Sequence, residues 1–335
     1  MWTTTSAIEQ DVQPLVSIVI PTKDRPTHLV RAVRCALDQA DVEVEVVVVD
    51  DGSRRPAEAV LHHELDRAPG RLRVVRSASS SGVARARNRG AALARGHWLG
   101  FCDDDDMWAP TKLSAHLAGA GRSAAWSCSG AVKVDERFHA FEIHHPPRPG
   151  ELLRQLLARN VIPGGASSVV IRTELFELVG GFDPSFSTLA DWDLWIRLAE
   201  QAPIAVVDDP LVAYLVQPAS MSTDTARFAE EVSRLLAKHR GPIDQLAVEF
   251  DSAGWHRYLG EMDLRANRRL AAGAHYLAAS RRGLRGSWKV AALAAISPRL
   301  ARRWLHRRTR VRHEHTVTAA QAWVDRAVAA GARDE

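Results

Sequence analysis

Four consecutive carboxylates, Asp103 to Asp106, directly follow the apolar run Trp98 to Cys102. Adjacent carboxylates repel one another, and hard divalent cations such as Mn²⁺ or Mg²⁺ prefer oxygen ligands and share them with phosphate groups. The segment therefore predicts a site for a metal ion and a diphosphate. The alternative is a solvated acidic turn. The position of the acids at the end of an apolar run favours the site, because ligands in open α/β sheets bind at the carboxyl ends of strands.

The elements that must position these acids are short apolar runs that alternate with helical patterns. The spacing predicts strands over 15–20, 44–49, 72–75 and 98–102. Runs this uniformly apolar are typical of a parallel sheet that is covered on both faces. We therefore predict an α/β fold with a mostly parallel central sheet flanked by helices. The turns 21–25, 50–53 and 103–106 should then share one edge of the sheet.

The turns carry none of the common phosphate-binding patterns. No GxGxxG follows the first run and no GxxxxGK[ST] occurs, which argues against a Rossmann dehydrogenase and a P-loop NTPase. Asp51 instead follows the second run, where it could accept a hydrogen bond from a base or a ribose hydroxyl. The local alternative is a polar turn, since Asp, Gly and Ser all favour turns.

Composition limits the class of protein. The chain has 335 residues, 46% of them hydrophobic and 25% charged, which is enough for one large core and a smaller unit. Cys35, Cys102 and Cys128 form neither a disulfide framework nor a CxxC metal site. Residues 1–11 lack a signal-peptide pattern, and no apolar stretch approaches 18 residues. We expect a cytoplasmic protein that does not span a membrane.

The last third of the chain reads as helical and basic. Amphipathic helices are predicted over 226–239, 244–260 and 264–280, the last two pairing as a hairpin. From Arg281 to Arg312 there are eleven Lys or Arg and no Asp or Glu, in a pattern interrupted at Pro298. Such a segment could contact the inner face of a membrane peripherally or pack on its own domain with a solvated face. Nucleic acid is disfavoured, because no stacking pattern of aromatic and basic residues accompanies the charge.

Four motifs occur in order: VSIVIPTKDRP at 16–26, VVDDGS at 48–53, ARNRG at 86–90, and the acidic run. Together they resemble the family 2 glycosyltransferases of the GT-A fold, over residues 14–222. The resemblance implies a UDP-, dTDP- or GDP-sugar donor, a Mn²⁺ or Mg²⁺ ion, and inverting transfer to a hydroxyl of a glycan, a lipid-linked sugar or a small molecule. The QxxRW element of processive relatives is absent, so transfer of a single sugar is expected. The implied domains are an N-terminal tail (1–13), the catalytic domain (14–222) and a helical C-terminal region (223–335).

The resemblance also assigns roles residue by residue. The metal ligands would be Asp103 and Asp105, with Asp105 as the direct ligand, although a run of four acids leaves the register open by one residue. The implied donor-binding residues are Pro21, Thr22, Asp24, Arg25, Asp51, Arg87 and Asp104. Relatives often have an aromatic residue and Asn at the positions of Lys23 and Asp24. Arg87 and Asn88 would either contact phosphate or fix the helix that begins near Val83. Residues 122–149 carry no motif and are expected to form loops on the acceptor side.

Asp191 is the candidate general base. Helical spacing places it on the same face as Leu194, Trp195 and Leu198, a face that should point inward. Inverting transfer needs one carboxylate to take the proton of the acceptor hydroxyl, and Asp191 matches the acidic motif that supplies this base in the family. The alternative is a helix N-cap, a role that Asp often takes. Asp193 is the second candidate.

Two other functions stay open from the sequence. A sugar nucleotidyltransferase can share an α/β sheet with metal-binding acids, but it would release pyrophosphate instead of a nucleoside diphosphate. A catalytically inactive module that binds nucleotide sugars would show donor binding without turnover.

Overall fold

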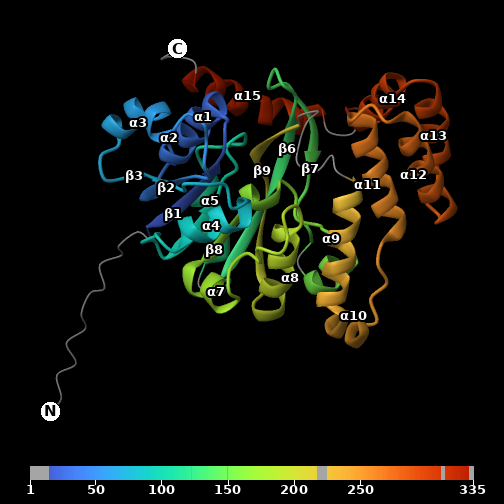
Figure 1. Ribbon diagram of the computed structural model, residues 1–335, viewed down its shortest axis with the longest axis horizontal. Helices are drawn as coiled ribbons and strands as arrows, with labels where there is room; N and C mark the ends of the chain where they lie inside the picture. Colours follow the sequence, from blue (N-terminus) through green and yellow to red (C-terminus); the bar gives the residue numbers. More distant parts are fainter. Residues whose placement is uncertain (1–14, 122, 149, 217–224, 311–313, 332–335) are drawn as a thin grey trace.

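The computed structural model describes residues 15–121, 123–148, 150–216, 225–310 and 314–331 (Figure 1). Its centre is a nine-stranded sheet. Eight of the strands follow the order β3-β2-β1-β4-β8-β6-β9-β5, and the ninth, β7, pairs with β6. The strands are β1 (Val16–Thr22), β2 (Val44–Asp50), β3 (Leu72–Arg76), β4 (Trp98–Phe101), β5 (Met107–Trp108), β6 (Trp126–Val134), β7 (Ala140–His144), β8 (Val169–Arg172) and β9 (Ile204–Leu215).

The α/β class is confirmed, and the four strands predicted in the first hundred residues are present. β3, β2, β1 and β4 pair in parallel, as expected for runs buried on both faces. Beyond β4 the pairing is mixed: β8 is antiparallel to β4 and to β6, whereas β6 and β9 are parallel. The predicted parallel arrangement therefore describes the half of the sheet that carries the nucleotide-site motifs.

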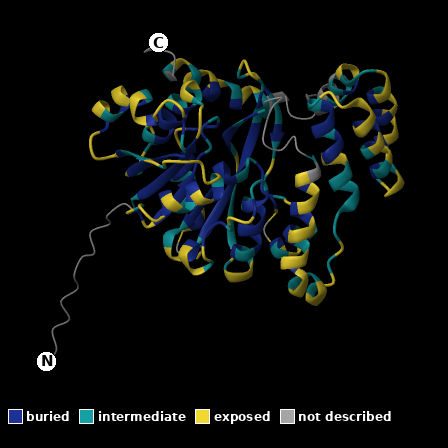
Figure 2. Cartoon of the chain, viewed as in Figure 1, coloured by how far each residue is buried: buried dark blue, intermediate teal, exposed yellow. Residues whose placement is uncertain are grey.

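Helices cover both faces of the sheet, and the strands divide their side chains between two cores. Ile18 and Val46 point into one core, whereas Val19 and Val47 point into the other. Figure 2 shows the sheet as the buried centre of the molecule. The helices of this part are α1 (Pro26–Leu37), α2 (Ala57–Val60), α3 (His62–Arg67), α4 (Val83–Ala91), α5 (Lys112–Ala120), α6 (Leu152–Ala158), α7 (Thr173–Leu178) and α8 (Ala190–Gln201), with a 3₁₀ turn at Gly165–Ser168.

Residues 122–149 do not form only loops, so that expectation is wrong. Half of the segment is β6 and β7, which pair with each other in antiparallel fashion. β6 also lies between β8 and β9 in the middle of the sheet. Residues 126–134 do alternate between apolar and polar or small side chains, which is the pattern of a strand, so the expectation of loops overlooked a local signal. The pairing partners of β6 are distant in the sequence.

The C-terminal helices are α9 (Thr225–Lys238), α10 (Arg240–Leu246), α11 (Ser252–Arg265), α12 (Arg269–Arg281), α13 (Ser287–Ile296), α14 (Pro298–Arg310) and α15 (Glu314–Gly331). The single helix expected over 244–260 is wrong. The chain leaves the helical conformation after Leu246, and Asp251 caps α11 by accepting the N–H of Gly254 at 2.8 Å. The pairing of α11 with α12 and the break before Pro298 are confirmed.

The first and last of these helices pack on the α/β part. α9 contributes Phe228 and Val232 to one sheet core, and α15 contributes Trp323 and Val324 to the other. Figure 1 shows α15 returning to lie beside α1, where Nη1 of Arg34 donates to a carbonyl of α15 at 2.9 Å. α11 to α14 enclose a small core of their own. The domain boundary expected near residue 222 and the tail 1–13 lie outside the described residues.

No helix in the described ranges has both the length and the apolar content that crossing a bilayer requires.

Candidate active site

The motif turns meet at the carboxyl edge of the parallel strands, as predicted. Thr22 pairs with Asp50 in the β1–β2 register, and Val19 pairs with Phe101 in the β1–β4 register. Past the strand ends, the N–H of Asp51 donates to the carbonyl of Thr22 at 2.9 Å, and that of Cys102 to the carbonyl of Val19 at 3.0 Å. These bonds hold the first residues of both acidic turns next to β1.

The four acids of the run divide into two kinds. Asp104 is buried and accepts the hydroxyl of Thr22 at 2.7 Å, and Asp106 is buried with its Oδ1 3.4 Å from the N–H of Leu215. The Asp103 and Asp105 side chains are 30% and 19% exposed. Every second carboxylate therefore keeps contact with solvent, and these two are the predicted metal ligands.

Two arginines partly neutralise the run. Nη1 of Arg25 lies 3.2 Å from Oδ1 of Asp104 and 2.5 Å from Oδ2 of Asp105. Nη2 of the buried Arg87 pairs with Oδ1 of Asp103, and its guanidinium also lies over the ring of Phe182. Both predicted arginines thus contact the acids directly.

The two arginines do not fully compensate the negative charge of the four carboxylates. Burial, together with the neighbouring Asp105, raises the pKa of Asp104 to about 7, although Arg25 and Thr22 act to lower it. Burial also raises the pKa of Asp105, with Arg25 opposing and Asp103 reinforcing the change. For Asp106, burial and then repulsion from Asp105 raise the pKa far above its usual range. A further cation near Asp103 and Asp105 would relieve this repulsion.

The exposed acids fit a cation that takes most of its ligands from elsewhere. In the described part of the chain, no three His, Cys, Asp or Glu side chains converge as a complete metal site. Mg²⁺ is commonly held by one or two carboxylates together with substrate phosphates. Asp103 and Asp105 can supply the two carboxylates, and the arginines beside them can pair with the phosphate groups of a substrate.

A cavity of about 450 Å³ opens beside the ends of β1 and β2, a size typical of small-molecule sites. Its lining combines apolar Leu29 and Val60 with the basic residues Arg25, Arg54 and Arg55. Its lining residues are Thr22, Asp24, Arg25, Pro26, Leu29, Ser53, Arg54, Arg55, Ala57 and Val60. Sequence reasoning missed Arg54 and Arg55; their signal is two adjacent basic residues directly after the VVDDGS turn.

Asp24 shapes the entrance to this cavity. Its φ of 57° lies in the left-handed region, which Asp and Asn adopt more readily than most residues. Its N–H donates to Oγ of Ser53 at 3.0 Å, and its Oδ1 accepts the N–H of Arg54 at 2.8 Å. That backbone hydrogen bond is the main cause of the lowered pKa of Asp24. Asp24 therefore ties the β1 turn to the β2 turn.

The carboxylate of Asp51 holds the loop that leads into α4. It accepts the hydroxyl of Ser80 at 2.7 Å and the N–H groups of Ser81 and Gly82 at 2.7 and 3.0 Å. Burial acts to raise its pKa, but these hydrogen bonds outweigh burial and lower it. Glycine at position 52 allows the backbone of Ser80 to lie close to this turn. The φ of Gly52 is +78°, and a Cβ there would lie 2.9 Å from the backbone N of Ser80.

Asp191 lies at the start of α8 but is not its cap. The N-cap position is Leu189, so the N-cap alternative is wrong. Oδ1 of Asp191 accepts the N–H of Trp192 at 2.7 Å, and Oδ2 faces Gly165, where a Cβ would lie 3.4 Å away. Burial raises the pKa of Asp191 to about 6, whereas Arg87 lowers it and Asp103 raises it. This carboxylate is thus electrostatically linked to the acidic run.

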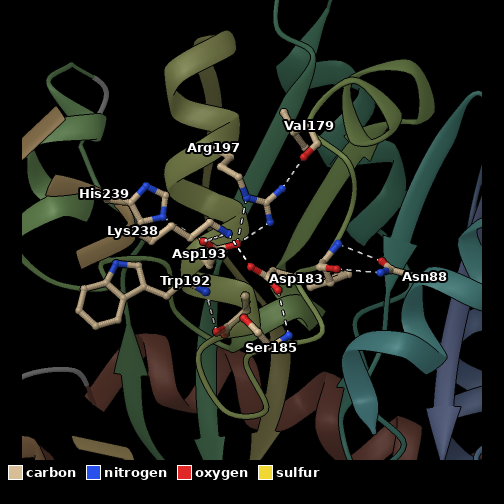
Figure 3. Close-up of polar contacts among 11 residues, drawn as sticks. Asn88, Val179, Asp183, Ser185, Trp192, Asp193, Arg197, Lys238 and His239 are labelled. Atoms are coloured by element: carbon tan, nitrogen blue, oxygen red, sulfur yellow. Dashed lines mark hydrogen bonds and ion pairs between the residues drawn. The ribbon is translucent and has the colours of Figure 1, made fainter. Parts of the chain in front are cut away.

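Asp193 has a different environment (Figure 3). Its side chain is fully buried, and its Oδ2 accepts Nε and Nη2 of Arg197 at 2.9 and 2.6 Å. Its Oδ1 lies 2.7 Å from Nζ of Lys238 and 2.9 Å from Nε2 of His239. Both oxygens are therefore engaged, which leaves Asp193 poorly suited to accept a proton from a substrate.

The loop after α7 is anchored to both helices of the site. Asn88 on α4 donates to the carbonyl of Phe182 at 2.7 Å and accepts its N–H at 2.9 Å. Arg197 on α8 donates to the carbonyl of Val179 at 2.6 Å (Figure 3). Asn88 thus fixes this loop, a role that the sequence did not indicate.

Residues 17–180 match the family model described as Glycosyl transferase family 2. The chain is 26% identical to an uncharacterized glycosyltransferase of Haemophilus influenzae over 247 residues, which cover 71% of this chain and 81% of the relative. It is 26% identical over 228 residues to TuaG of Bacillus subtilis, a putative teichuronic acid biosynthesis glycosyltransferase, covering 65% and 86% of the two chains. Among solved structures, that of Staphylococcus aureus TarS 1–349 in complex with UDP aligns with a TM-score of 0.49 and 18% identity, covering 82% of this chain and 89% of the other.

The chain carries a family 2 glycosyltransferase domain, and the protein is a transferase. The central sheet flanked by helices is the GT-A-like fold that the motifs led us to expect. The sugar nucleotidyltransferase and the inactive binding module are disfavoured accordingly.

Proposed function

We propose that the enzyme moves one sugar from a nucleoside-diphosphate sugar to an acceptor hydroxyl, with inversion at the anomeric carbon. The observation that supports this most is the placement of three features at one sheet edge. These are the arginine-lined cavity, the partly exposed carboxylates of Asp103 and Asp105, and the partly buried carboxylate of Asp191 with its raised pKa.

The cavity is the proposed binding site for the nucleotide of a UDP-, dTDP- or GDP-sugar. Pro21 and Thr22 lie in the last residues of β1 at this edge, and Asp24 and Arg25 line the cavity wall. Asp51 is the proposed partner of the base, in addition to ordering residues 80–82. Arg54 and Arg55 supply positive charge for an anionic ligand.

Asp103 and Asp105 are the proposed ligands of Mn²⁺ or Mg²⁺, with Asp104 behind them held by Thr22. When bound, the cation neutralises charge on the departing nucleoside diphosphate. Arg25 and Arg87 each pair with one oxygen of Asp105 and Asp103, respectively, and a carboxylate has two oxygens that can serve as ligands. Beside these carboxylates, the two guanidinium groups would pair with the diphosphate.

Asp191 is the proposed general base. It takes the proton of the acceptor hydroxyl while the hydroxyl oxygen bonds to the anomeric carbon and the bond from that carbon to the diphosphate breaks. A pKa of about 6 leaves the carboxylate mostly deprotonated at neutral pH, yet basic enough to accept a proton. Gly165 keeps the space beside its Oδ2 free of a side chain.

The test is Asp191→Asn, which retains the shape of the side chain and removes its basicity. We expect unchanged donor affinity and kcat lowered by about 10²-fold or more. Release of nucleoside diphosphate without pyrophosphate, and an inverted product anomer by NMR, are expected of the wild type. The matched control is Asp244→Asn, at a 70% exposed aspartate on α10. Wild-type kcat in Asp191→Asn would refute the assignment of the base.

A cytoplasmic location and peripheral contact with the inner face of a membrane through the C-terminal region belong to the same proposal. The basic composition of residues 281–312 supports the membrane contact.

A further inference from the structure

Exposed apolar side chains concentrate on three neighbouring helices. Of the eight large apolar side chains that are exposed in the described ranges, five lie on α12, α13 and α14. They are Leu270, Leu277, Trp288, Ile296 and Leu300. Leu270 and Ile296 are 75% and 71% exposed, and Trp288 is 55% exposed. Scattered single residues of this kind are ordinary, but five within 31 positions on three consecutive helices are a concentration that needs an explanation.

On α12 the exposed residues form a stripe opposite the buried ones. Ala272 and Tyr276 face the small core of α11 to α14, and Ala279 on the same helix is also buried. Leu270, Ala274 and Leu277 are exposed at positions i, i+4 and i+7, the spacing of one helix face. The outer face of α12 is therefore apolar instead of polar.

α13 repeats the arrangement. Val290, Ala291 and Ala294 are buried against the same core, whereas Trp288, Ala292 and Ile296 are exposed at i, i+4 and i+8. α12 and α13 pack against each other and are joined by residues 282–286. Figure 1 places both helices at the side of the molecule farthest from β1 to β3. We call these two apolar stripes the outer face of α12 and α13.

Positive charge surrounds this face. Between Asp263 and Glu314 the sequence contains fourteen Lys or Arg and no acidic residue. The exposed cations include Arg281, Arg282 and Arg285 between the two helices, Lys289 on α13, and Arg299 at the start of α14. A partner that covers the apolar stripes must therefore also accept positive charge at their ends.

We propose that the outer face of α12 and α13 docks on an anionic lipid bilayer. A bilayer interface accepts Trp, Leu and Ile side chains beneath a layer of phosphate groups that pair with Arg and Lys. A second copy of this chain would bring like charges together. Nucleic acid would satisfy the arginines but would leave the aliphatic side chains in water. The inference rests on the membrane contact proposed for the C-terminal region and assigns it to a particular surface, which is separate from the proposed donor site at β1 and β2.

The experiment uses the full chain and sedimentation with vesicles of phosphatidylcholine that contain about one third phosphatidylglycerol. We expect binding at low salt, release as salt screens the attraction, and little binding to vesicles of phosphatidylcholine alone. Trp288→Ser and Ile296→Ser should each weaken partitioning by about tenfold, or about 1.4 kcal/mol. The matched control is Leu178→Ser, at a leucine that is 69% exposed on α7.

Charge is tested in the same assay. The double variant with Arg281→Gln and Arg285→Gln should weaken binding to anionic vesicles by about tenfold at low salt and flatten its salt dependence. Arg240→Gln is the control, because that side chain on α10 is 81% exposed outside the patch. Donor-induced thermal stabilisation is measured for every variant and should stay unchanged, which separates a failed docking surface from a failed donor site.

Several outcomes would overturn the proposal. One is no binding of the wild type to anionic vesicles. Another is equal loss of binding in Leu178→Ser and Ile296→Ser. Binding to a single-stranded RNA or a DNA duplex without vesicle binding would assign the charge to nucleic acid. A wild-type oligomer in ultracentrifugation that Ile296→Ser dissociates, again without vesicle binding, would assign the outer face to a second copy.

Discussion

Replacement of Asp193 by Ala should destabilise the fold far more than the loss of a surface acid. The carboxylate is fully buried and meets Arg197, Lys238 and His239 within 3 Å (Figure 3). Removal of one partner from a buried ion pair typically costs about 3–5 kcal/mol, because the remaining charge stays buried without compensation. The Arg197 side chain is only 16% exposed, so it cannot reach water easily.

The structure places the expected cost near the lower end of that range. Lys238 keeps a second carboxylate, since its Nζ also lies 2.7 Å from Oδ2 of Asp183 (Figure 3). Arg197 keeps the carbonyl of Val179, but among the described residues no other acid pairs with it. We therefore expect a loss of about 3 kcal/mol in the free energy of unfolding, dominated by Arg197.

The contribution of Asp193 to the free energy of unfolding should also depend on pH. Burial acts to raise the pKa of Asp193, but the hydrogen bond from His239 and the charge of Arg197 outweigh it, so the folded pKa is lowered. A lowered folded pKa means that the stabilisation is complete above the ordinary Asp value near 3.8 and is lost as the pH falls through the folded value. The difference between wild type and Asp193→Ala should therefore be full at pH 7 and should shrink only in acid below about pH 4.

The assay is urea unfolding followed by tryptophan fluorescence at several pH values. The control is Asp244→Asn, which breaks a surface pair with Arg240 at 3.6 Å and should change the free energy of unfolding by less than about 1 kcal/mol. A loss below about 1 kcal/mol in Asp193→Ala, or a loss equal to that of the control, would refute the reasoning from burial.

Three further predictions follow from the site and the fold. Asp105→Ala should abolish Mn²⁺-dependent stabilisation by UDP, GDP or dTDP in thermal-shift measurements while keeping the melting temperature of the free protein within a few degrees, and persistent metal-dependent stabilisation would contradict the ligand assignment. The specificity constant kcat/KM should fall as the pH decreases through about 6, where Asp191 gains a proton. A kcat/KM that stays constant down to pH 5 would exclude a base with that pKa. Deletion of α15 should destabilise the α/β part by several kcal/mol, because Trp323 and Val324 are buried in its core, and unchanged urea unfolding would show that this packing is dispensable.

The parallel half of the fold was predictable from the sequence because its signals are local. Val44 to Val49 is too apolar for a strand with one exposed face, and the turn residues that end it fix where the strand stops. Likewise, helical spacing alone was enough to place Asp191 on the face of Leu194 and Trp195, and both of these neighbours are fully buried.

What the sequence could not supply depends on contacts between distant segments. Arg25 meets Asp105 across 80 positions, and Arg34 bonds α15 across 296 positions. Neither contact has a periodic signal, because each follows from how the sheet brings its turns and helices together. The strand character of β6 had a local signal in the alternation of residues 126–134, but its place between β8 and β9 depends on segments that come later in the chain.

Asp191 and Asp193, the two candidates for the general base, lie within one turn of α8 but have different environments. Residues two positions apart on a helix point about 200° away from each other. Asp191 accordingly faces Gly165 and the charges of Arg87 and Asp103, whereas Asp193 faces α9 and is held there by Lys238 and His239. The side chains that make Asp193 unfit to accept a proton also fix the first turn of α8. The carboxylate proposed for catalysis is therefore positioned by a neighbour that takes no part in the reaction itself.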